Sequence, residues 1–210
     1  MPIPVADLTP AGGPHLDAYL AGLAASSEVS EVVVADAGGS TFAAAQKALG
    51  PKLEATGKDA VALLREHQPK LALVTMEAVL APAAIDAALE HGCHVHAEKP
   101  ACVRASDFEP LVRKAEGKHL HLMLAFANRI RPEAREAQRL VREGRLGKLY
   151  GMEIHLVADQ TRLKSPSYRQ NWSGQKARAG GGHLTWLGIH WLDLALFITG
   201  AEVEAVAGFS

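Results

Sequence analysis

Short apolar runs alternate with longer amphipathic stretches through the first part of the chain. The apolar runs have the length of strands, and the stretches between them have the periodicity of helices. The expected strands are residues 3–8, 29–35, 71–75, 93–97 and 120–125. The expected helices are residues 15–25, 40–49, 59–67, 82–91 and 106–116. Strands separated by helices of this length predict an α/β fold with a doubly wound parallel sheet.

A different pattern begins near Asn128. Pro132 is expected to start a helix, because the apolar positions that follow share one face, and Gly144 is expected to end it. The remaining expected elements follow in order: a strand at 148–159, a polar, glycine-rich loop at 160–182, an apolar helix at 187–199 and a strand at 203–209. We therefore expect two domains, residues 1–126 and residues 127–210. The second would be an incomplete α+β domain with an open sheet.

Composition and charge exclude several classes of protein. The chain has 210 residues, of which 48% are hydrophobic and 21% charged, as in ordinary globular proteins. A formal net charge of −1 gives no electrostatic reason to expect nucleic acid or a membrane surface as a partner. No apolar run is long enough to cross a bilayer. Cys93 and Cys102 make no disulfide framework, and the N-terminus lacks the features of a secretory signal, so we expect a cytoplasmic protein.

The loop after the first expected strand is a partial match to a dinucleotide-binding loop. Glycines in such a loop permit a tight turn and let backbone N–H groups approach a pyrophosphate at a helix N-terminus. Here segment 9–14 reads T-P-A-G-G-P, so Thr9, Ala11 and Pro14 stand where G-x-G-x-x-G has glycine. Gly12 and Gly13 remain as candidate cofactor-binding residues. The alternative is a loop that only turns the chain.

Two polar residues at strand ends are further candidates for a cofactor site. Asp36 ends the second expected strand, where a carboxylate can accept a hydrogen bond from a ribose 2′-hydroxyl. No Lys or Arg follows it before Lys47, which favours NAD over NADP. Alternatively, Asp36 caps the next turn. Thr75 ends the strand at 71–75 and can line the same crevice at the carboxyl edge of the sheet.

Two separated segments carry the most specific signal. Glu98-Lys99-Pro100 follows the strand at 93–97, and the proline restricts the residue before it to extended geometry. Far downstream, three glycines at 180–182 precede the segment G-I-H-W-L-D at 188–193. Together these segments resemble the sugar oxidoreductase family typified by glucose–fructose oxidoreductase and inositol dehydrogenase. The resemblance implies a Rossmann-type dinucleotide-binding domain at 1–126 and a substrate-binding or oligomerisation domain at 127–210.

The resemblance also implies roles for individual residues. It puts Lys99 beside the nicotinamide and the substrate hydroxyl, and it maps His190 to the catalytic histidine of the family. Proton exchange with a hydroxyl needs groups of this kind within hydrogen-bond reach. Glu98 and Asn128 are implied to contact the cofactor, since Asn128 falls where the family has an Asn-Arg pair at the domain junction. For Lys99 alone, a salt-bridged lysine at a strand end is the alternative.

The chain departs from the family pattern at one position of the downstream segment. Trp186 stands where the family has Asp, and its indole is either a stacking face for a sugar ring or part of the core. His183 can supply the missing polar group. Asp193 lies one helical turn after His190; it is a candidate substrate-binding residue and can also orient that helix or the histidine. Tyr168, in the loop at 160–182, is a candidate to close over a sugar.

Histidine pairs raise the question of a metal. His94 and His96 alternate on one expected strand, as do His119 and His121 on another, and same-face pairs on adjacent strands can bind a metal. However, no Cys or carboxylate cluster completes a ligand set. We therefore expect no metal.

We expect an NAD-dependent oxidoreductase that transfers a hydride between the cofactor and a hydroxyl of a small-molecule sugar or polyol. The degraded glycine loop and Trp186 leave two alternatives: a non-catalytic relative that binds a nucleotide or carbohydrate, and a lyase-like or glycosidase-like relative that recycles NAD. The sheet of the second domain is incomplete in this chain. We therefore expect a homo-oligomer that covers the apolar side chains of residues 203–209.

Overall fold

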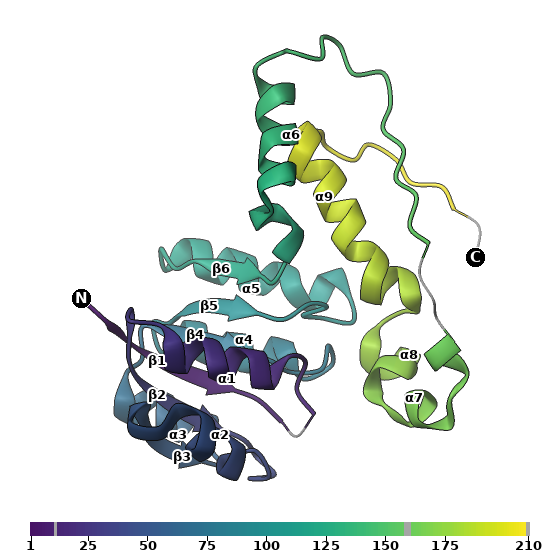
Figure 1. The fold of residues 1–210 in the computed structure, drawn as a ribbon. Helices are drawn as coiled ribbons and strands as arrows, with labels where there is room; N and C mark the ends of the chain where they lie inside the picture. Colours follow the sequence, from purple (N-terminus) through teal and green to yellow (C-terminus); the bar gives the residue numbers. More distant parts are fainter. Residues whose placement is uncertain (11, 158–160, 209–210) are drawn as a thin grey trace.

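The computed structural model of the chain describes residues 1–10, 12–157 and 161–208. Its centre is a parallel sheet of six strands in the order β3-β2-β1-β4-β5-β6 (Figure 1). The strands are β1 (Ile3–Leu8), β2 (Val29–Ala35), β3 (Leu53–Gly57), β4 (Leu71–Val74), β5 (His94–Ala97) and β6 (Leu122–Leu124). The strand order reverses direction between β1 and β4, as in doubly wound sheets. The expected α/β fold is confirmed.

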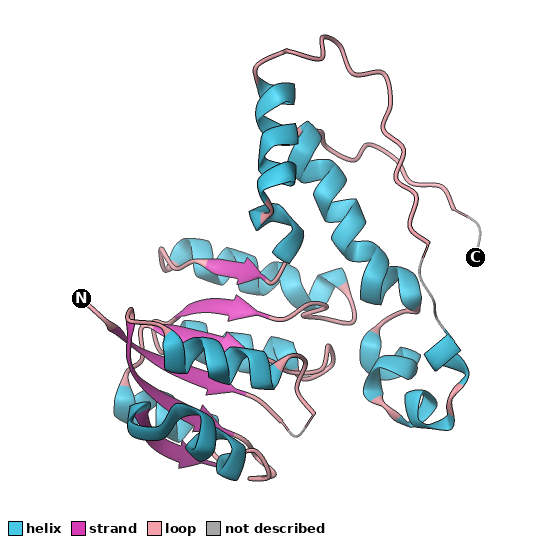
Figure 2. Ribbon diagram, in the orientation of Figure 1, coloured by secondary structure: helices cyan, strands magenta, loops and turns pink. Residues whose placement is uncertain are grey.

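Helices cover both faces of the sheet (Figure 2). They are α1 (Leu16–Ala25), α2 (Phe42–Leu49), α3 (Ala60–His67), α4 (Ala81–Glu90) and α5 (Ala105–Gly117). Alternate residues of a strand point to opposite faces, so Val5 packs with α1 and α2, while Ala6 and Leu8 pack with α3, α4 and α5. Because both faces are covered, the strands read as nearly continuous apolar runs, which is why the sequence predicted them.

One strand escaped prediction. β3 lies at the edge of the sheet and pairs in parallel with β2. Its sequence, L-E-A-T-G, alternates half-buried and exposed positions and has no apolar run. An edge strand is buried on fewer sides, so its sequence is less constrained than that of β1 or β2.

The second part of the chain is largely helical. Helix α6 (Pro132–Arg142) packs against α9 (Ile189–Thr199), and the Gln138 side chain donates a hydrogen bond to the Phe197 carbonyl at 2.6 Å. Gly200, with φ of 66°, ends α9 as expected. The region expected to be a loop instead contains short helices, including α7 (Pro166–Gln170) and α8 (Lys176–Ala179). A π-helical turn at Leu184–Gly188 leads into α9.

The two strands expected in the second part are not formed in the described residues. Residues 148–157 and 201–208 have no strand pairing, while Asp159 and Phe209 lie outside the described residues. A strand is stable only when a neighbour accepts and donates its backbone hydrogen bonds. Apolar side chains in these segments are exposed, with Tyr150 at 89% and Val206 at 87%. The expected open sheet is therefore absent from the described residues.

A small contact region attaches the downstream glycine segment to the sheet. Glu77, which is 7% exposed, forms an ion pair with Arg178 of α8 at 2.5 Å. Ala78 is buried against Trp172 and Ala179. Gly180 completes the contact with a φ of 81°, because a Cβ there would lie 2.9 Å from the Val103 carbonyl oxygen. Only glycine satisfies both the backbone angle and the close approach.

One ionisable side chain is buried in the middle of the sheet. Asp7 of β1 has no exposed surface, and neither of its carboxylate oxygens has a hydrogen-bond partner among the described residues. Burial raises the pKa of Asp7 to about 7. The Thr75 hydroxyl lies nearby and lowers this pKa, without hydrogen-bond geometry and without offsetting the burial.

Among the residues that the structure describes, no helix has both the length and the apolar character that a bilayer crossing requires.

A pair of glycine substitutions tests the packing of the loop after β1. A Cβ on Gly13 would lie 2.5 Å from Thr9 Oγ1 and 2.6 Å from the Thr75 carbonyl oxygen. We expect Gly13→Ala to lower the free energy of unfolding by roughly 1–3 kcal/mol. Gly22, inside α1, has open space around it, so Gly22→Ala should raise that free energy by up to about 1 kcal/mol. Urea unfolding that shows equal effects would contradict this packing.

Asp7→Asn should change how stability depends on pH. Because folding raises the pKa of Asp7 from 3.8 to about 7, the unfolded chain loses this proton first. The stability of the wild type therefore falls as pH rises from about 4 to 7, by at most roughly 4 kcal/mol. The variant should lack this loss, so its advantage over the wild type grows across that range. The matched control is the exposed Glu54→Gln, and parallel pH curves for Asp7→Asn and the wild type would refute the assignment.

Candidate active site

Two adjoining cavities open where the carboxyl ends of the central strands meet the downstream helices. The large cavity has a volume of about 980 Å³ and the small cavity about 410 Å³, and His15 lines both. In a doubly wound sheet, the crevice at this edge beside the reversal of strand order is the usual ligand site. The two cavities therefore contain the candidate active site.

The large cavity brings together several residues that the sequence singled out. Lys99 and Glu98, which follow β5, line it together with Asn128 from the 3-10 turn Ala127–Ile130. His190, the second residue of α9, lines it as well. Residues from both expected domains thus face one space, although the sequence separates them widely.

The Lys99 side chain rests on Trp186. Its Nζ donates a hydrogen bond to the Trp186 carbonyl at 3.1 Å and lies 4.2 Å from the centroid of the indole ring. An ammonium over the face of a tryptophan is stabilised by the ring quadrupole. Lys99 is only 5% exposed, so these contacts replace water around its charge. Trp186 is therefore a partner of the lysine, and its edge also packs on Trp172.

His190 is held in its neutral form by its surroundings. Burial lowers the pKa of His190, and the positive charge of Lys99 lowers it further. The carboxylates of Glu98 and Asp193 act in the opposite direction, without reversing the shift. A neutral imidazole can accept a proton, so the geometry places a proton acceptor in the same cavity as a lysine.

Among the residues described, the Asp193 carboxylate pairs with the Arg129 side chain and does not line either cavity. Arg129 Nε donates to Asp193 Oδ2 at 2.8 Å, and Arg129 Nη2 donates to Oδ1. This bidentate pair joins the turn that carries Asn128 to the helix that carries His190, and Asp193 is only 8% exposed. Among the described residues that line the two cavities, Asp193 is not found. The pair joins α9 to the turn at Ala127–Ile130, and the geometry does not place Asp193 where the substrate-binding role expected for it would require.

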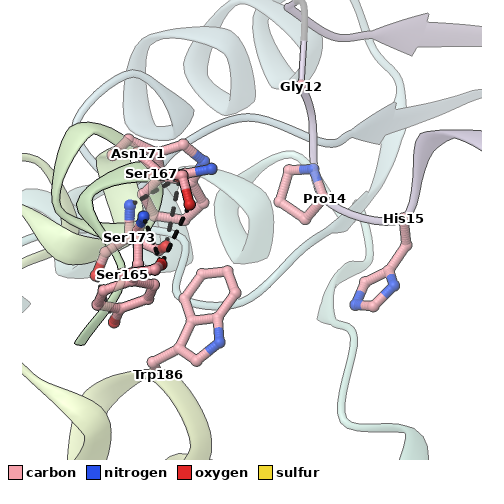
Figure 3. Close-up of a pocket in the computed structure, with 10 residues that line it drawn as sticks. Gly12, Pro14, His15, Ser165, Ser167, Asn171, Ser173 and Trp186 are labelled. Carbon is pink, nitrogen blue, oxygen red and sulfur yellow. Dashed lines mark hydrogen bonds between the residues drawn. The ribbon is translucent and has the colours of Figure 1, made fainter. Parts of the chain in front are cut away.

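The small cavity lies between the loop after β1 and the short downstream helices. Figure 3 shows Gly12, Pro14 and His15 on one side, serines and Asn171 on the other, and the Trp186 indole between them. Tyr168 lines this cavity, and its hydroxyl donates to the Ser173 carbonyl at 3.2 Å. His183, the other expected polar group, lines neither cavity in the described part of the chain, and its buried Nδ1 has no hydrogen-bond partner there.

The loop after β1 keeps one glycine open and buries the other. Gly12 has a φ of 73° and no atom within 4 Å of where a Cβ would be, so a ligand can approach its backbone. Gly13 packs against Thr9 and Thr75. Thr75 is 1% exposed and packs under the loop at Gly13. It is not among the described residues that line the two cavities.

Asp36 is engaged by its own turn. Its Oδ1 accepts a hydrogen bond from Gly38 N–H at 2.9 Å, and Oδ2 accepts from the N–H and hydroxyl of Thr41, both at 3.0 Å. Ser40 adds a third donor to Oδ2 at 3.2 Å. Burial raises the pKa of Asp36, but these hydrogen bonds together bring it below its ordinary value. The structure thus realises the capping alternative for Asp36.

A cation that sequence reasoning missed lies beside this turn. A Cβ on Gly39 would lie 3.2 Å from Cε of Lys58, which follows β3. The expectation that no cation stands near Asp36 is therefore wrong. The error follows from the missed strand, because only the pairing of β3 with β2 brings Lys58 to this place.

Tyr19 and His96 are two further cavity residues that the sequence did not reveal as a pair. Tyr19 is on α1 and His96 on β5, and both line the large cavity beside Glu98. Strand periodicity places His96 on the face covered by α1. No local pattern marks Tyr19, which meets His96 only through tertiary packing.

Among the described residues, no three His, Cys, Asp or Glu side chains gather in a way that could hold a metal ion. His94 and His121 do lie together, with ring centroids 5.0 Å apart, and His94 Nδ1 accepts a hydrogen bond from the His121 backbone.

Comparison with known proteins identifies the family. The family model described as "Oxidoreductase family, NAD-binding Rossmann fold" matches residues 12–126, and the one described as "GFO/IDH/MocA C-terminal domain" matches residues 134–210. The chain belongs to the GFO/IDH/MocA oxidoreductase family. Residues 12–126 therefore belong to a family with an NAD-binding Rossmann fold, even though their glycine loop departs from the G-x-G-x-x-G pattern.

Individual relatives are similar at low identity. Levoglucosan dehydrogenase of Pseudarthrobacter phenanthrenivorans is 28% identical over 120 residues, or 57% of this chain and 30% of that protein. A solved levoglucosan dehydrogenase in complex with NADH and levoglucosan has a TM-score of 0.78 at 21% identity, covering 95% of this chain and 54% of the other. Scyllo-inositol dehydrogenase of Lactobacillus casei, solved with NAD(H) and scyllo-inositol, has a TM-score of 0.75 at 18% identity, covering 95% and 57%.

These structural similarities show the fold. The chain spans about half the length of the solved relatives and about a third of the curated relative.

The residues present fit a nicotinamide dinucleotide in two places. Polar groups of Lys99, Asn128 and Glu98 line one cavity, as a nicotinamide and its ribose require, and the open backbone at Gly12 borders the other. The fit is poorer at the end of β2, where the Asp36 carboxylate already accepts hydrogen bonds from its own turn.

Removal of Arg129 tests whether its pair with Asp193 fixes α9. Arg129→Ala leaves a buried carboxylate unpaired, and we expect it to lower the free energy of unfolding by roughly 3 kcal/mol. The matched control is Arg139→Ala, since Arg139 forms exposed ion pairs with Glu136 and Glu143. Its cost should stay below about 1 kcal/mol. Equal losses in chemical denaturation would show that the Arg129–Asp193 pair has no special structural role.

Proposed function

We propose that the protein is a nicotinamide-dependent oxidoreductase that acts on a hydroxyl of a sugar or polyol. The observation that carries the proposal is the placement of Lys99 and His190 in one cavity at the carboxyl edge of an NAD-binding Rossmann sheet. Relatives named for the oxidation of levoglucosan and scyllo-inositol support the substrate class. In this proposal, residues 1–126 bind the dinucleotide and residues 127–210 contribute the substrate side of the cavity.

The two cavity residues have complementary roles in this reaction. The cofactor, when bound, accepts or supplies the hydride. His190 is neutral near pH 7, because its pKa lies below the ordinary value of 6.5, and it takes the proton of the substrate hydroxyl. Lys99, whose Nζ lies over the Trp186 ring, donates a hydrogen bond to the same oxygen. Proton transfer and charge stabilisation then converge on one oxygen atom.

The remaining expected residues act around this pair. Glu98 and Asn128 face the cofactor from the large cavity, and Gly12 and Tyr168 border the small cavity. Trp186 lines the small cavity, where a sugar ring can stack on its indole. Asp193 acts indirectly, through Arg129 and the position of α9.

The proposed cofactor is NAD in preference to NADP. The anionic Asp36 at the end of β2 disfavours a 2′-phosphate nearby, while Lys58 beside Gly39 works against this preference. Calorimetric titration of NADH and NADPH should give tighter binding of NADH. The control is Lys58→Ala, which should weaken NADPH binding more than NADH binding. Tighter NADPH binding by the wild type, lost in Lys58→Ala, would make Lys58 the determinant and NADP the cofactor.

Single substitutions test the catalytic assignment. Lys99→Ala and His190→Ala should each lower kcat by ~10²–10⁴-fold with a polyol that the wild type oxidises, the usual span for acid–base groups. The exposed Lys47→Ala and His155→Ala are matched controls and should retain the wild-type rate. The wild-type rate should also fall in acid, once the pH drops below the lowered pKa of His190 and its imidazole becomes protonated. A panel of sugars and polyols that gives no reduction of NAD would favour a non-catalytic binding protein.

A homo-oligomer and a cytoplasmic location stay predictions. The exposed side chains of Val203 and Val206, at 59% and 87%, are consistent with a surface that a second copy covers. Sedimentation at tens of micromolar would decide between a monomer and an oligomer.

A further inference from the structure

A chain of hydrogen bonds leads from the sheet face to the residue before Lys99. His96 Nε2 lies 3.3 Å from the Tyr19 hydroxyl, which donates to Glu98 Oε1 at 2.7 Å. The other carboxylate oxygen of Glu98 accepts from the backbone N–H of Lys99 at 3.1 Å. The Tyr19 and His96 rings also meet edge to face, with centroids 5.9 Å apart. All four residues line the large cavity.

The direction of each hydrogen bond follows from the protonation states. Burial, followed by the hydrogen bond and charge of Glu98, raises the pKa of Tyr19, so the phenol keeps its proton and donates. Burial lowers the pKa of His96 despite the opposing charge of Glu98, so the imidazole is neutral. Its Nε2–H tautomer then donates to the Tyr19 oxygen. Each donor in this series of hydrogen bonds therefore points toward Glu98, which is the last acceptor.

Glu98 depends on this arrangement because it is almost completely buried. It is 4% exposed, and loss of either donor leaves a buried carboxylate oxygen without a partner. The ionisable groups around Glu98 and Tyr19 come from four elements: Asp7 of β1, which acts on Tyr19, Tyr19 itself on α1, His96 and Lys99 at β5, and His190 of α9. Of the two donors to Glu98, the Lys99 N–H is its neighbour in sequence, whereas the Tyr19 hydroxyl comes from a different element, α1.

Tyr19 therefore connects two parts of the proposed site. It belongs to α1, which begins directly after the loop of residues 12–15. Glu98 belongs to the segment that carries Lys99. A hydroxyl that bridges these elements sets the distance between the loop after β1 and the lysine.

We propose that Tyr19 is a positioning residue, whose hydroxyl holds the Glu98 carboxylate and thereby fixes the direction in which Lys99 enters the large cavity. This inference rests on the proposed function, because Lys99 is assigned to catalysis there. Tyr19 need not touch the substrate, since it acts through Glu98.

The first experiment measures the coupling without any turnover. The protein is labelled with 3-fluorotyrosine, whose phenol is more acidic than that of tyrosine, and the fluorine signals are followed by NMR against pH. The Tyr19 signal is the one missing in Tyr19→Phe. It should ionise at lower pH in Glu98→Gln than in the otherwise unchanged protein, because the carboxylate no longer opposes ionisation. The exposed Tyr150 serves as an internal control. An unchanged Tyr19 titration overturns the inference.

The second experiment measures whether Tyr19 acts through Glu98. Tyr19→Phe should lower kcat by roughly tenfold, as expected for the loss of one hydrogen bond to a charged group, while KM for the polyol stays within about twofold. The double variant Tyr19→Phe/Glu98→Gln should be no slower than Glu98→Gln alone, because residues that act through each other are not additive. Tyr150→Phe is the matched control. Multiplicative losses, or a wild-type kcat in Tyr19→Phe, overturn the inference.

The two experiments separate this inference from the proposed function. If the wild type turns over no sugar or polyol while the Tyr19 titration responds to Glu98→Gln, the proposed reaction fails and the hydrogen-bonded positioning of Glu98 stands. If turnover is present and the titration does not respond, the reaction stands and the role of Tyr19 is refuted.

Discussion

The candidate site depends on the attachment of the downstream glycine segment to the edge of the sheet. The Glu77–Arg178 ion pair and the packing of Ala78 on Trp172 hold the short helices in place. Gly180 lets the backbone approach Val103, directly after the segment that carries Lys99. Because α9 follows from this anchored segment, the position of His190 depends on these contacts and on the Arg129–Asp193 pair. The chemistry is assembled by packing between two halves of the chain.

Within the site, the charge of Lys99 is stabilised by an aromatic ring and a backbone carbonyl of Trp186. The family pattern has an acidic residue where this chain has Trp186, and the lysine here rests on an aromatic face and a backbone carbonyl. A quadrupole stabilises an ammonium without offering it a proton acceptor. The charge on Lys99 in turn lowers the pKa of His190, so the two groups divide into a cation and a neutral base.

The sequence predicted the fold better than the site, for physical reasons. Strands buried on both faces, such as β1 and β2, leave apolar runs that can be read locally, whereas the edge strand β3 leaves none. The alternating pattern at 148–157 was equally readable, but a strand also needs a partner, and none is formed in the described residues. The motifs that carry Lys99 and His190 are specific enough to single out both residues, and the structure places them in one cavity. Tyr19 and Lys58 could not be found, since only tertiary pairing brings them to the site.

The turn around Asp36 has a consequence for any attempt to redesign this protein. Both oxygens of that carboxylate accept hydrogen bonds from Gly38, Ser40 or Thr41, so Asp36 stabilises the turn that leads into α2. An acidic residue at this place contacts the ribose in many Rossmann folds, which makes it the obvious position to change in order to switch nucleotide preference. Here such an exchange would leave four donor groups, from three residues, without their acceptor, and it would destabilise the turn that leads into α2. The preference for NAD or NADP is better changed at Lys58, directly after the neighbouring strand β3, because that substitution keeps the hydrogen bonds of the Asp36 turn.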